Sequence, residues 1–412
     1  MDVSLVILFV AVLVGLYSAI NIGANDVANS MATSVASGAL TIKKALFVAA
    51  ICNILGAVLV GTYVINTIRK GLVDPLQFSD TPNLFMYGML ASVLGSALWV
   101  NIATYFKLPV STTHSIIGGV LGFGLVSVGF AGINWNVVLF VVLSWIFSPV
   151  FGGVISFSIF SIIKKFILSS PEPIKKTKKI GPFFSGSVGF ILSLAVTFKG
   201  LKNFHIDLSP LEAFLISLLV GAAFFFAGNF LLRRYKEKDT DPYYQVEKMA
   251  NPLQILSASF QAFSHGANDV ANAIGPVAAI FAILHTHQVE MKVTVPFWLL
   301  LMGGGGIAFG VYMWGYRVME TVGKKITAIT PTRGFSAEFG TATTVLICSR
   351  LGMPVSTTHV AIGNIIGVGL ARGISAINLG VLKKIFSAWV ISLPAAGLFS
   401  VAFYHIFIFL FG

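Results

Sequence analysis

Long runs of apolar residues, separated by short polar or basic segments, follow one another along the chain. Runs of about 20 apolar residues are long enough to cross a hydrocarbon core of roughly 30 Å. The short stretches of alternating polarity typical of a transmembrane barrel are not evident. The pattern predicts an all-α polytopic membrane protein. Composition agrees, because only 10% of the residues are charged, against roughly 25% in soluble domains.

Two short strings each occur twice. Residues 23–29 read Gly-Ala-Asn-Asp-Val-Ala-Asn and recur letter for letter at 266–272, while Pro-Val-Ser-Thr-Thr-His stands at 109–114 and 354–359. A period this long indicates two copies of a domain half rather than a solenoid. We therefore expect one transport domain in three parts. A first repeat spans 1–166, a linking region with a lysine-rich loop, two spans and a second basic loop spans 167–250, and a second repeat spans 251–412.

The apolar segments around the two seven-residue strings are too long for one straight crossing. As a single helix, residues 3–40 would extend about 57 Å, nearly twice the hydrocarbon core. We therefore expect broken or re-entrant helices, with the first break at residues 23–26. Further helices should start after Pro109 and Pro354, because proline precedes helix starts and Ser or Thr caps them. The first apolar run lacks the basic start and cleavage site of a signal peptide and is interpreted as a retained span.

Basic residues predict the orientation. Six lysines lie in 164–179 and a second basic cluster at 233–238, and such loops are typically cytoplasmic. Counting spans outward from a cytoplasmic lysine-rich loop places both termini outside the cell and makes the halves enter the membrane in opposite senses. Such inverted-topology repeats are typical of secondary transporters. Arg69 and Lys70 fall outside and fit less well. The net charge of +12 indicates contact with anionic lipid rather than nucleic acid.

Acidic residues inside apolar segments mark candidate cation sites. A carboxylate at that depth is costly, so Asp26 and Asp269 are read as ion or proton sites; alternatively, they only shape a helix break. Glu338 has no acidic counterpart in the first half and is predicted to be a third cation contact, unless it faces a loop. Oxygen ligands suit Na⁺ or H⁺, and nothing resembles a soft-metal site. The neighbouring amides that would contribute are Asn25, Asn29, Asn268 and Asn272.

The hydroxyl-rich strings are candidate anion sites. Free amides and the dipole at a helix start favour phosphate or sulfate, and two opposed starts could enclose one tetrahedral anion. The alternative is ordinary capping without a ligand. His114 and His359 are possible accessory residues, which either contact substrate or only hold neighbouring helices. The predicted anion-binding residues are Ser111, Thr112, Thr113, Ser356, Thr357 and Thr358.

The doubled strings, together with Thr-Pro-Thr-Arg-Gly-Phe at 330–335 before Glu338, resemble the signature of the inorganic phosphate transporter (PiT) family. The resemblance implies a phosphate symporter of the plasma membrane with twelve membrane segments, working as a homodimer. It implies that the hydroxyls hold phosphate, that the aspartates serve cations, and that Asn25 and Asn268 shape both sites. Two departures stand out. The loop at 233–251 is short, so loop-based regulation is not expected, and Asn53 stands where some members carry an acid.

The predicted function is import of phosphate by alternating access, coupled to Na⁺. Coupling to H⁺, or transport of a metal–phosphate complex, is the alternative. A phosphohydrolase with His114 or His359 as nucleophile is a rival, but it lacks an Arg or Lys clamp within the spans. An anion channel would not need the aspartates. No cofactor motif is found, and Cys52 and Cys348 in apolar runs argue against a disulfide or a thiolate metal site. We expect a protein that is not an enzyme.

Overall fold

The computed structural model describes residues 3–61, 72–199, 208–289, 295–351, 353 and 355–412. The described part is helical, with thirteen α-helices, of which nine are long and apolar enough to cross a membrane. The prediction of an all-α multi-span membrane protein is confirmed. The nine are α1 (Val3–Ala36), α2 (Ile42–Val60), α4 (Pro82–Tyr105), α6 (Trp135–Ile163), α7 (Pro173–Lys199), α8 (Pro210–Arg233), α9 (Pro242–Thr286), α10 (Phe297–Trp314) and α14 (Leu379–Phe411).

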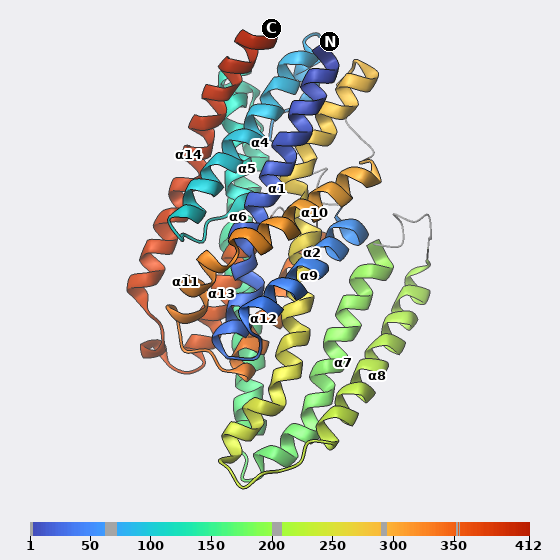
Figure 1. Cartoon of the computed structure of the whole chain (residues 1–412), viewed down its shortest axis with the longest axis vertical. Helices are drawn as coiled ribbons and strands as arrows, with labels where there is room; N and C mark the ends of the chain where they lie inside the picture. Colours follow the sequence, from blue (N-terminus) through green and yellow to red (C-terminus); the bar gives the residue numbers. More distant parts are fainter. Residues whose placement is uncertain (1–2, 62–71, 200–207, 290–294, 352, 354) are drawn as a thin grey trace.

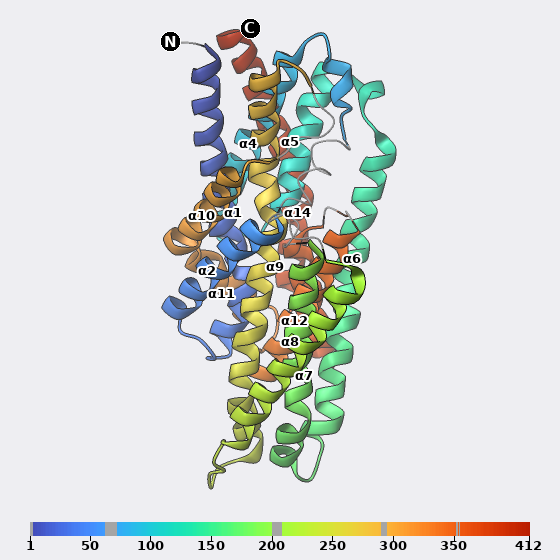
Figure 2. The same ribbon diagram turned by 90° about the vertical axis from the view of Figure 1, so that its right-hand side faces the viewer.

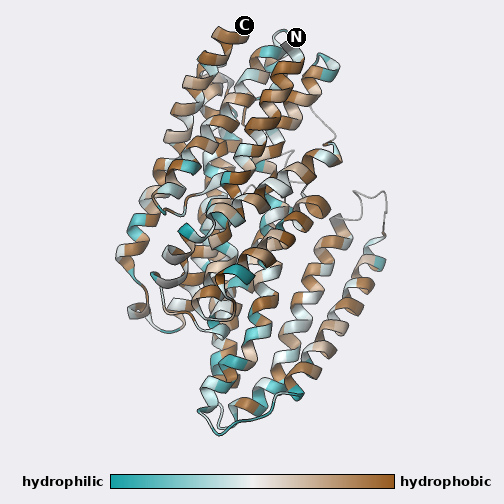
Figure 3. Ribbon diagram, viewed as in Figure 1, coloured by the Kyte–Doolittle hydropathy of each residue, from teal (hydrophilic) through white to brown (hydrophobic). Residues whose placement is uncertain are grey.

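Four further α-helices belong to the described fold. They are α5 (Thr112–Ser127), α11 (Tyr316–Lys324), α12 (Pro331–Arg350) and α13 (Thr357–Leu370). The helices form an elongated bundle with both chain ends at one end and the α6–α7 and α8–α9 connections at the other (Figures 1 and 2). Hydrophobic residues cover most of the long helices, and hydrophilic residues gather at the α8–α9 connection (Figure 3). The predicted count of twelve segments and the inverted arrangement remain predictions.

The lysine-rich segment is mostly helical, which corrects the expectation of a loop. Lys164 and Lys165 lie in a π-helical turn that extends α6 to residue 168, and the other four lysines lie in the first turns of α7. Lysine is a good helix former, and Pro173 suits a first helical position, so only residues 169–172 form the turn. Arg69, Lys70 and the end of the span expected near Asn66 lie outside the described residues.

Both helices that carry the seven-residue string run through it without a break, so the predicted break at residues 23–26 is wrong. Helix α1 has 34 residues, about 51 Å of helix, and α9 has 45. The polar side chains of the string bond to other segments, which leaves the main-chain hydrogen bonds of the helix intact. A helix longer than the hydrocarbon core can tilt or project beyond it.

The glycines of the string permit close helix crossings. A Cβ on Gly23 would lie 1.9 Å from the carbonyl oxygen of Ile307 in α10, and one on Gly266 would lie 2.2 Å from that of Asn53 in α2. Glycine is required because the neighbouring atom is backbone and cannot rotate away. The run of four glycines at 303–306 is likewise helical within α10, so it packs rather than unwinds.

The chain instead leaves helical structure just before α5 and α13. Ser111 and Ser356 are the N-cap residues of these helices, close to the helix starts expected after the two prolines; Pro354 itself lies outside the described residues. The two helices occupy opposite halves of the bundle along its long axis (Figure 1). Their first turns therefore lie near its middle.

Candidate functional site

The two hydroxyl-rich strings form capped helix starts, as predicted. The Ser111 hydroxyl accepts a hydrogen bond from the backbone N–H of His114 at 3.0 Å, and Ser356 accepts from the N–H of His359 at 3.2 Å. Each serine satisfies one of the amides that a helix start leaves without an intrahelical partner. The amides of the threonines in the same first turns stay available to a ligand.

Hydrogen bonds join the two helix starts to each other. Thr113 Oγ1 donates to the carbonyl oxygen of Val355 at 3.2 Å, and Thr358 Oγ1 can donate to that of Val110 at 3.0 Å. These segments are separated by 242 and 248 residues, yet each reaches the residue just before the other cap. The predicted meeting of the two strings is observed.

Asp26 lies directly against both helix starts. Its side chain is 1% exposed and accepts hydrogen bonds from Thr112 Oγ1 at 2.8 Å and from Asn29 Nδ2 at 3.1 Å. Thr358 Oγ1, from the other half of the chain, lies 3.1 Å from the same carboxylate. The carboxylate is therefore held by residues of both strings.

Asp269 repeats this arrangement in the second half. It is fully buried and accepts from Thr357 Oγ1 at 2.8 Å, from Asn268 Nδ2 at 2.8 Å and from Asn272 Nδ2 at 3.3 Å. Asn272 also donates to Thr112 Oγ1 of the first half at 3.3 Å. The threonine and the second asparagine of the string thus bond to both aspartates in the same way, whereas the third partner differs.

The first asparagine of each string clamps the extended segment before the nearby helix start. Asn25 accepts from the N–H of Val110 at 3.1 Å and donates to the carbonyl oxygen of Leu108 at 3.0 Å. It also donates to Thr104 Oγ1, while Asn268 accepts from Ser349 Oγ. Sequence reasoning missed Thr104 and Ser349, although the same separation that relates Ser111 to Ser356 relates these two.

His265 is a further member of the site that the sequence prediction did not include. Its Nε2 lies 3.0 Å from an oxygen of Asp269 and 3.6 Å from an oxygen of Asp26, and its Nδ1 lies 2.5 Å from Asn53 Oδ1. These two carboxylates and this imidazole are the described residues whose ligand atoms are grouped closely enough, within 4.8 Å, to hold a metal ion. Because Ile22 occupies the equivalent position in the first half, comparison of the two repeats does not identify His265 as a site residue.

Glu338 is buried in a second polar cluster, so the alternative of a loop-facing carboxylate is wrong. It is 1% exposed and accepts from Thr33 at 2.5 Å, Ser34 at 2.7 Å, Ser257 at 2.6 Å and Gln254 at 3.3 Å. Thr33 lies about 10 Å along α1 from Asp26, so α1 contributes to both clusters, which are separate. A direct contact between Glu338 and a cation remains a prediction.

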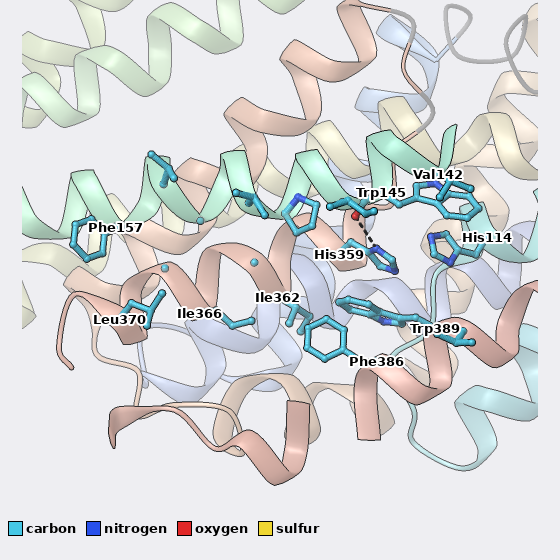
Figure 4. A pocket seen from close by; sticks show the side chains of 18 of the residues that line it. His114, Val142, Trp145, Phe157, His359, Ile362, Ile366, Leu370, Phe386 and Trp389 are labelled. Carbon is cyan, nitrogen blue, oxygen red and sulfur yellow. Dashed lines mark hydrogen bonds between the residues drawn. The ribbon is translucent and has the colours of Figure 1, made fainter. Parts of the chain in front are cut away.

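His114 and His359 face each other beside the helix starts, with ring centroids 4.3 Å apart. Each stacks on a tryptophan, His114 on Trp145 at 3.5 Å and His359 on Trp389 at 3.6 Å. The tryptophans come from α6 and α14 (Figure 4). These contacts hold neighbouring helices together, which is the simpler of the two expectations; a contact with substrate remains untested.

This chain is similar to known proteins in both sequence and structure. A family model described as the phosphate transporter family matches residues 22–400. A protein of Pyrococcus abyssi named as a phosphate permease is 46% identical over 399 residues, covering 97% of each chain. A phosphate permease of Haemophilus influenzae is 39% identical and covers 97% of this chain and 96% of its own. A solved structure described as the sodium-dependent phosphate transporter is 44% identical, with a TM-score of 0.92 over 98% of this chain and 99% of its own.

Proposed function

Because the chain belongs to the phosphate transporter family, we propose that it imports inorganic phosphate across the plasma membrane in symport with Na⁺. Its family consists of transporters, so the prediction that it is not an enzyme is confirmed and the phosphohydrolase reading is discarded. The observation that carries the proposal is the meeting of two helix starts at a pair of buried aspartates. Relatives named as phosphate permeases and a similar structure described as sodium-dependent support the choice of solutes.

Phosphate binds at the starts of α5 and α13. The threonine amides of both first turns lack intrahelical partners, and the positive ends of two helix dipoles converge there. The buried residues Ser111, Thr112, Thr113, Ser356, Thr357 and Thr358 supply hydroxyls at the same two helix starts. These groups replace the water that phosphate loses on leaving solution.

Cations make this site acceptable to an anion. Asp26 and Asp269 would repel phosphate, so each must be neutralised when phosphate is present. Carboxylate oxygens, with nearby asparagine oxygens, suit Na⁺, and a buried Glu338 offers a further contact in its own cluster. Protons are the alternative coupling ion, favoured by the position of His265 between both aspartates.

Transport proceeds by alternating access between two inverted repeats, 1–166 and 251–412. The matched hydrogen bonds of the two aspartates and the placement of α5 and α13 in opposite halves of the bundle support this organisation. Midplane sites between such repeats are exposed to one side and then the other as the repeats rock. The proposed orientation has both termini outside and the basic ends of α6 and α7 inside, and the working unit is a homodimer.

Uptake of radiolabelled phosphate into proteoliposomes tests the proposal. An inward Na⁺ gradient should drive concentrative uptake, and Asp26→Asn or Asp269→Asn should abolish it while leaving the protein inserted. Uptake driven by H⁺ alone would replace Na⁺ by protons in the same scheme. Uptake indifferent to both gradients would contradict symport and indicate an anion channel. Wild-type uptake by either variant would refute the assignment of the aspartates.

A further inference from the structure

A large groove lies between α6, α13 and α14, beside the proposed phosphate site. Its volume is about 1080 Å³. His114, His359, Trp145 and Trp389 stand at one end of the residues drawn, and Phe157 and Leu370 stand at the other (Figure 4). The groove is therefore elongated, and its two ends differ in chemistry.

The walls of the groove are apolar over most of its length. They include Ile362 and Ile366 from α13, Phe157 from α6 and Phe386 from α14. From His359 to Leu370 the groove follows α13 for about 16 Å, roughly half of a 30 Å hydrocarbon core. This length matches the depth that one lipid leaflet's acyl chains occupy.

One end of the groove contains buried nitrogen atoms that lack hydrogen-bond partners within the described part of the chain. Nε2 of His114, Nε2 of His359 and the indole nitrogens of Trp145 and Trp389 are buried without a hydrogen-bond partner among the described residues. Both histidines are 5% exposed. Buried polar atoms are normally paired because an unpaired one costs free energy. A cluster of four at the end of a groove indicates a ligand with a polar group.

The tautomer of His359 defines that polar group. Nδ1 of His359 lies 3.5 Å from the carbonyl oxygen of Trp145. When Nδ1 donates to that oxygen it carries the ring proton, so Nε2 of His359 can only accept. The indole N–H groups can only donate. A ligand that fits must have a small polar group that both donates and accepts a hydrogen bond. It must also carry an apolar chain.

We propose that this groove binds a long-chain fatty acid, with its carboxylic acid group between the histidines and tryptophans and its chain along α13. The acid O–H donates to a histidine Nε2, and the carbonyl oxygen accepts from an indole N–H. His114 and His359 directly follow Thr113 and Thr358, so the ligand touches both helices that begin at the proposed phosphate site. Binding of the fatty acid does not depend on the proposed transport activity.

Photolabelling of the full-length protein in liposomes tests the proposal. The probe is a palmitic acid analogue with a diazirine on its chain, and labelled peptides are identified by mass spectrometry. We expect labelling on α6, α13 and α14 that unlabelled palmitic acid displaces. Ile366→Trp, which fills the groove, should reduce labelling at least tenfold. Leu139→Trp is the matched control, because Leu139 is also on a groove helix but is 58% exposed and does not line the groove.

A second probe decides the proposal without relying on the groove-filling variant. On the wild-type protein, the methyl ester of the probe should label at least fivefold less, because it cannot donate to Nε2. Equal labelling by acid and ester, or labelling spread evenly over the exposed helix faces, would overturn the proposal. Absence of groove labelling together with disulfide cross-linking between two Val390→Cys copies would overturn it as well, because a second copy would then cover the groove.

Discussion

Replacing Gly23 by alanine should separate α1 from α10. The new Cβ would lie 1.9 Å from the carbonyl oxygen of Ile307, a backbone atom that cannot move without its helix. Overpacking of this kind costs about 1–3 kcal/mol and occasionally more, and a clash with backbone belongs at the upper end. The intrinsic gain of about 1 kcal/mol for alanine over glycine in a helix offsets only part of it. Because Asp26 lies one turn further along α1, the displacement also moves the carboxylate.

The neighbouring Gly305 provides a matched control within α10. A Cβ there would have no atom within 4 Å, so Gly305→Ala should keep uptake and raise thermal stability slightly. We expect Gly23→Ala to lower the midpoint of thermal unfolding in detergent and to reduce Na⁺-driven phosphate uptake in proteoliposomes. Gly266→Ala should do the same, because its Cβ would lie 2.2 Å from the Asn53 carbonyl oxygen. Equal stability and uptake of Gly23→Ala and Gly305→Ala would refute the close-crossing explanation.

Three other substitutions test the polar clusters. Thr112→Val and Thr357→Val each remove a 2.8 Å hydrogen bond to an aspartate, worth about 1.5–3 kcal/mol. Both should lower thermal stability, Thr112→Val the more because Thr112 Oγ1 also accepts from Asn272. Thr343→Val should not, because that buried hydroxyl has no partner among the described residues. Losses no larger than that of Thr343→Val would contradict a stabilising role of these bonds. Glu338→Gln replaces an acceptor oxygen by a donor and should raise the Na⁺ concentration for half-maximal uptake, and an unchanged value would argue against a coupling role.

The doubled strings made the composition of the site predictable, because polar residues buried in apolar segments need hydrogen-bond partners. Both helix starts, their serine caps and the meeting of the two starts followed from this pattern. The expected break at residues 23–26 was wrong because helix length and glycine content were read as a need to unwind. The structure uses Gly23 for a close crossing instead, and such a contact depends on the position of another helix, which local sequence does not give.

Residues that lack a counterpart in the other half were harder to predict. His265 aligns with Ile22, and Gln254 and Ser257, which donate to Glu338, align with Ala11 and Val14. Comparison of the two halves highlights only what they share. These polar side chains could have been noticed because a polar residue within an apolar helix costs free energy. Their partners become clear only when α9 and α12 lie side by side.

The hydrogen bonds between the two halves of the chain can form only after the second half has been synthesised. Asp26 and Thr358 are 332 residues apart, so at about 5–20 residues per second the ribosome needs roughly 15 to 65 seconds to supply the second residue after the first. Glu338 joins Thr33 and Ser34 almost as late. During this interval the newly made α1 stays in the membrane with its carboxylate only partly bonded. Until α13 is made, the Asp26 carboxylate therefore lacks its hydrogen bond to Thr358.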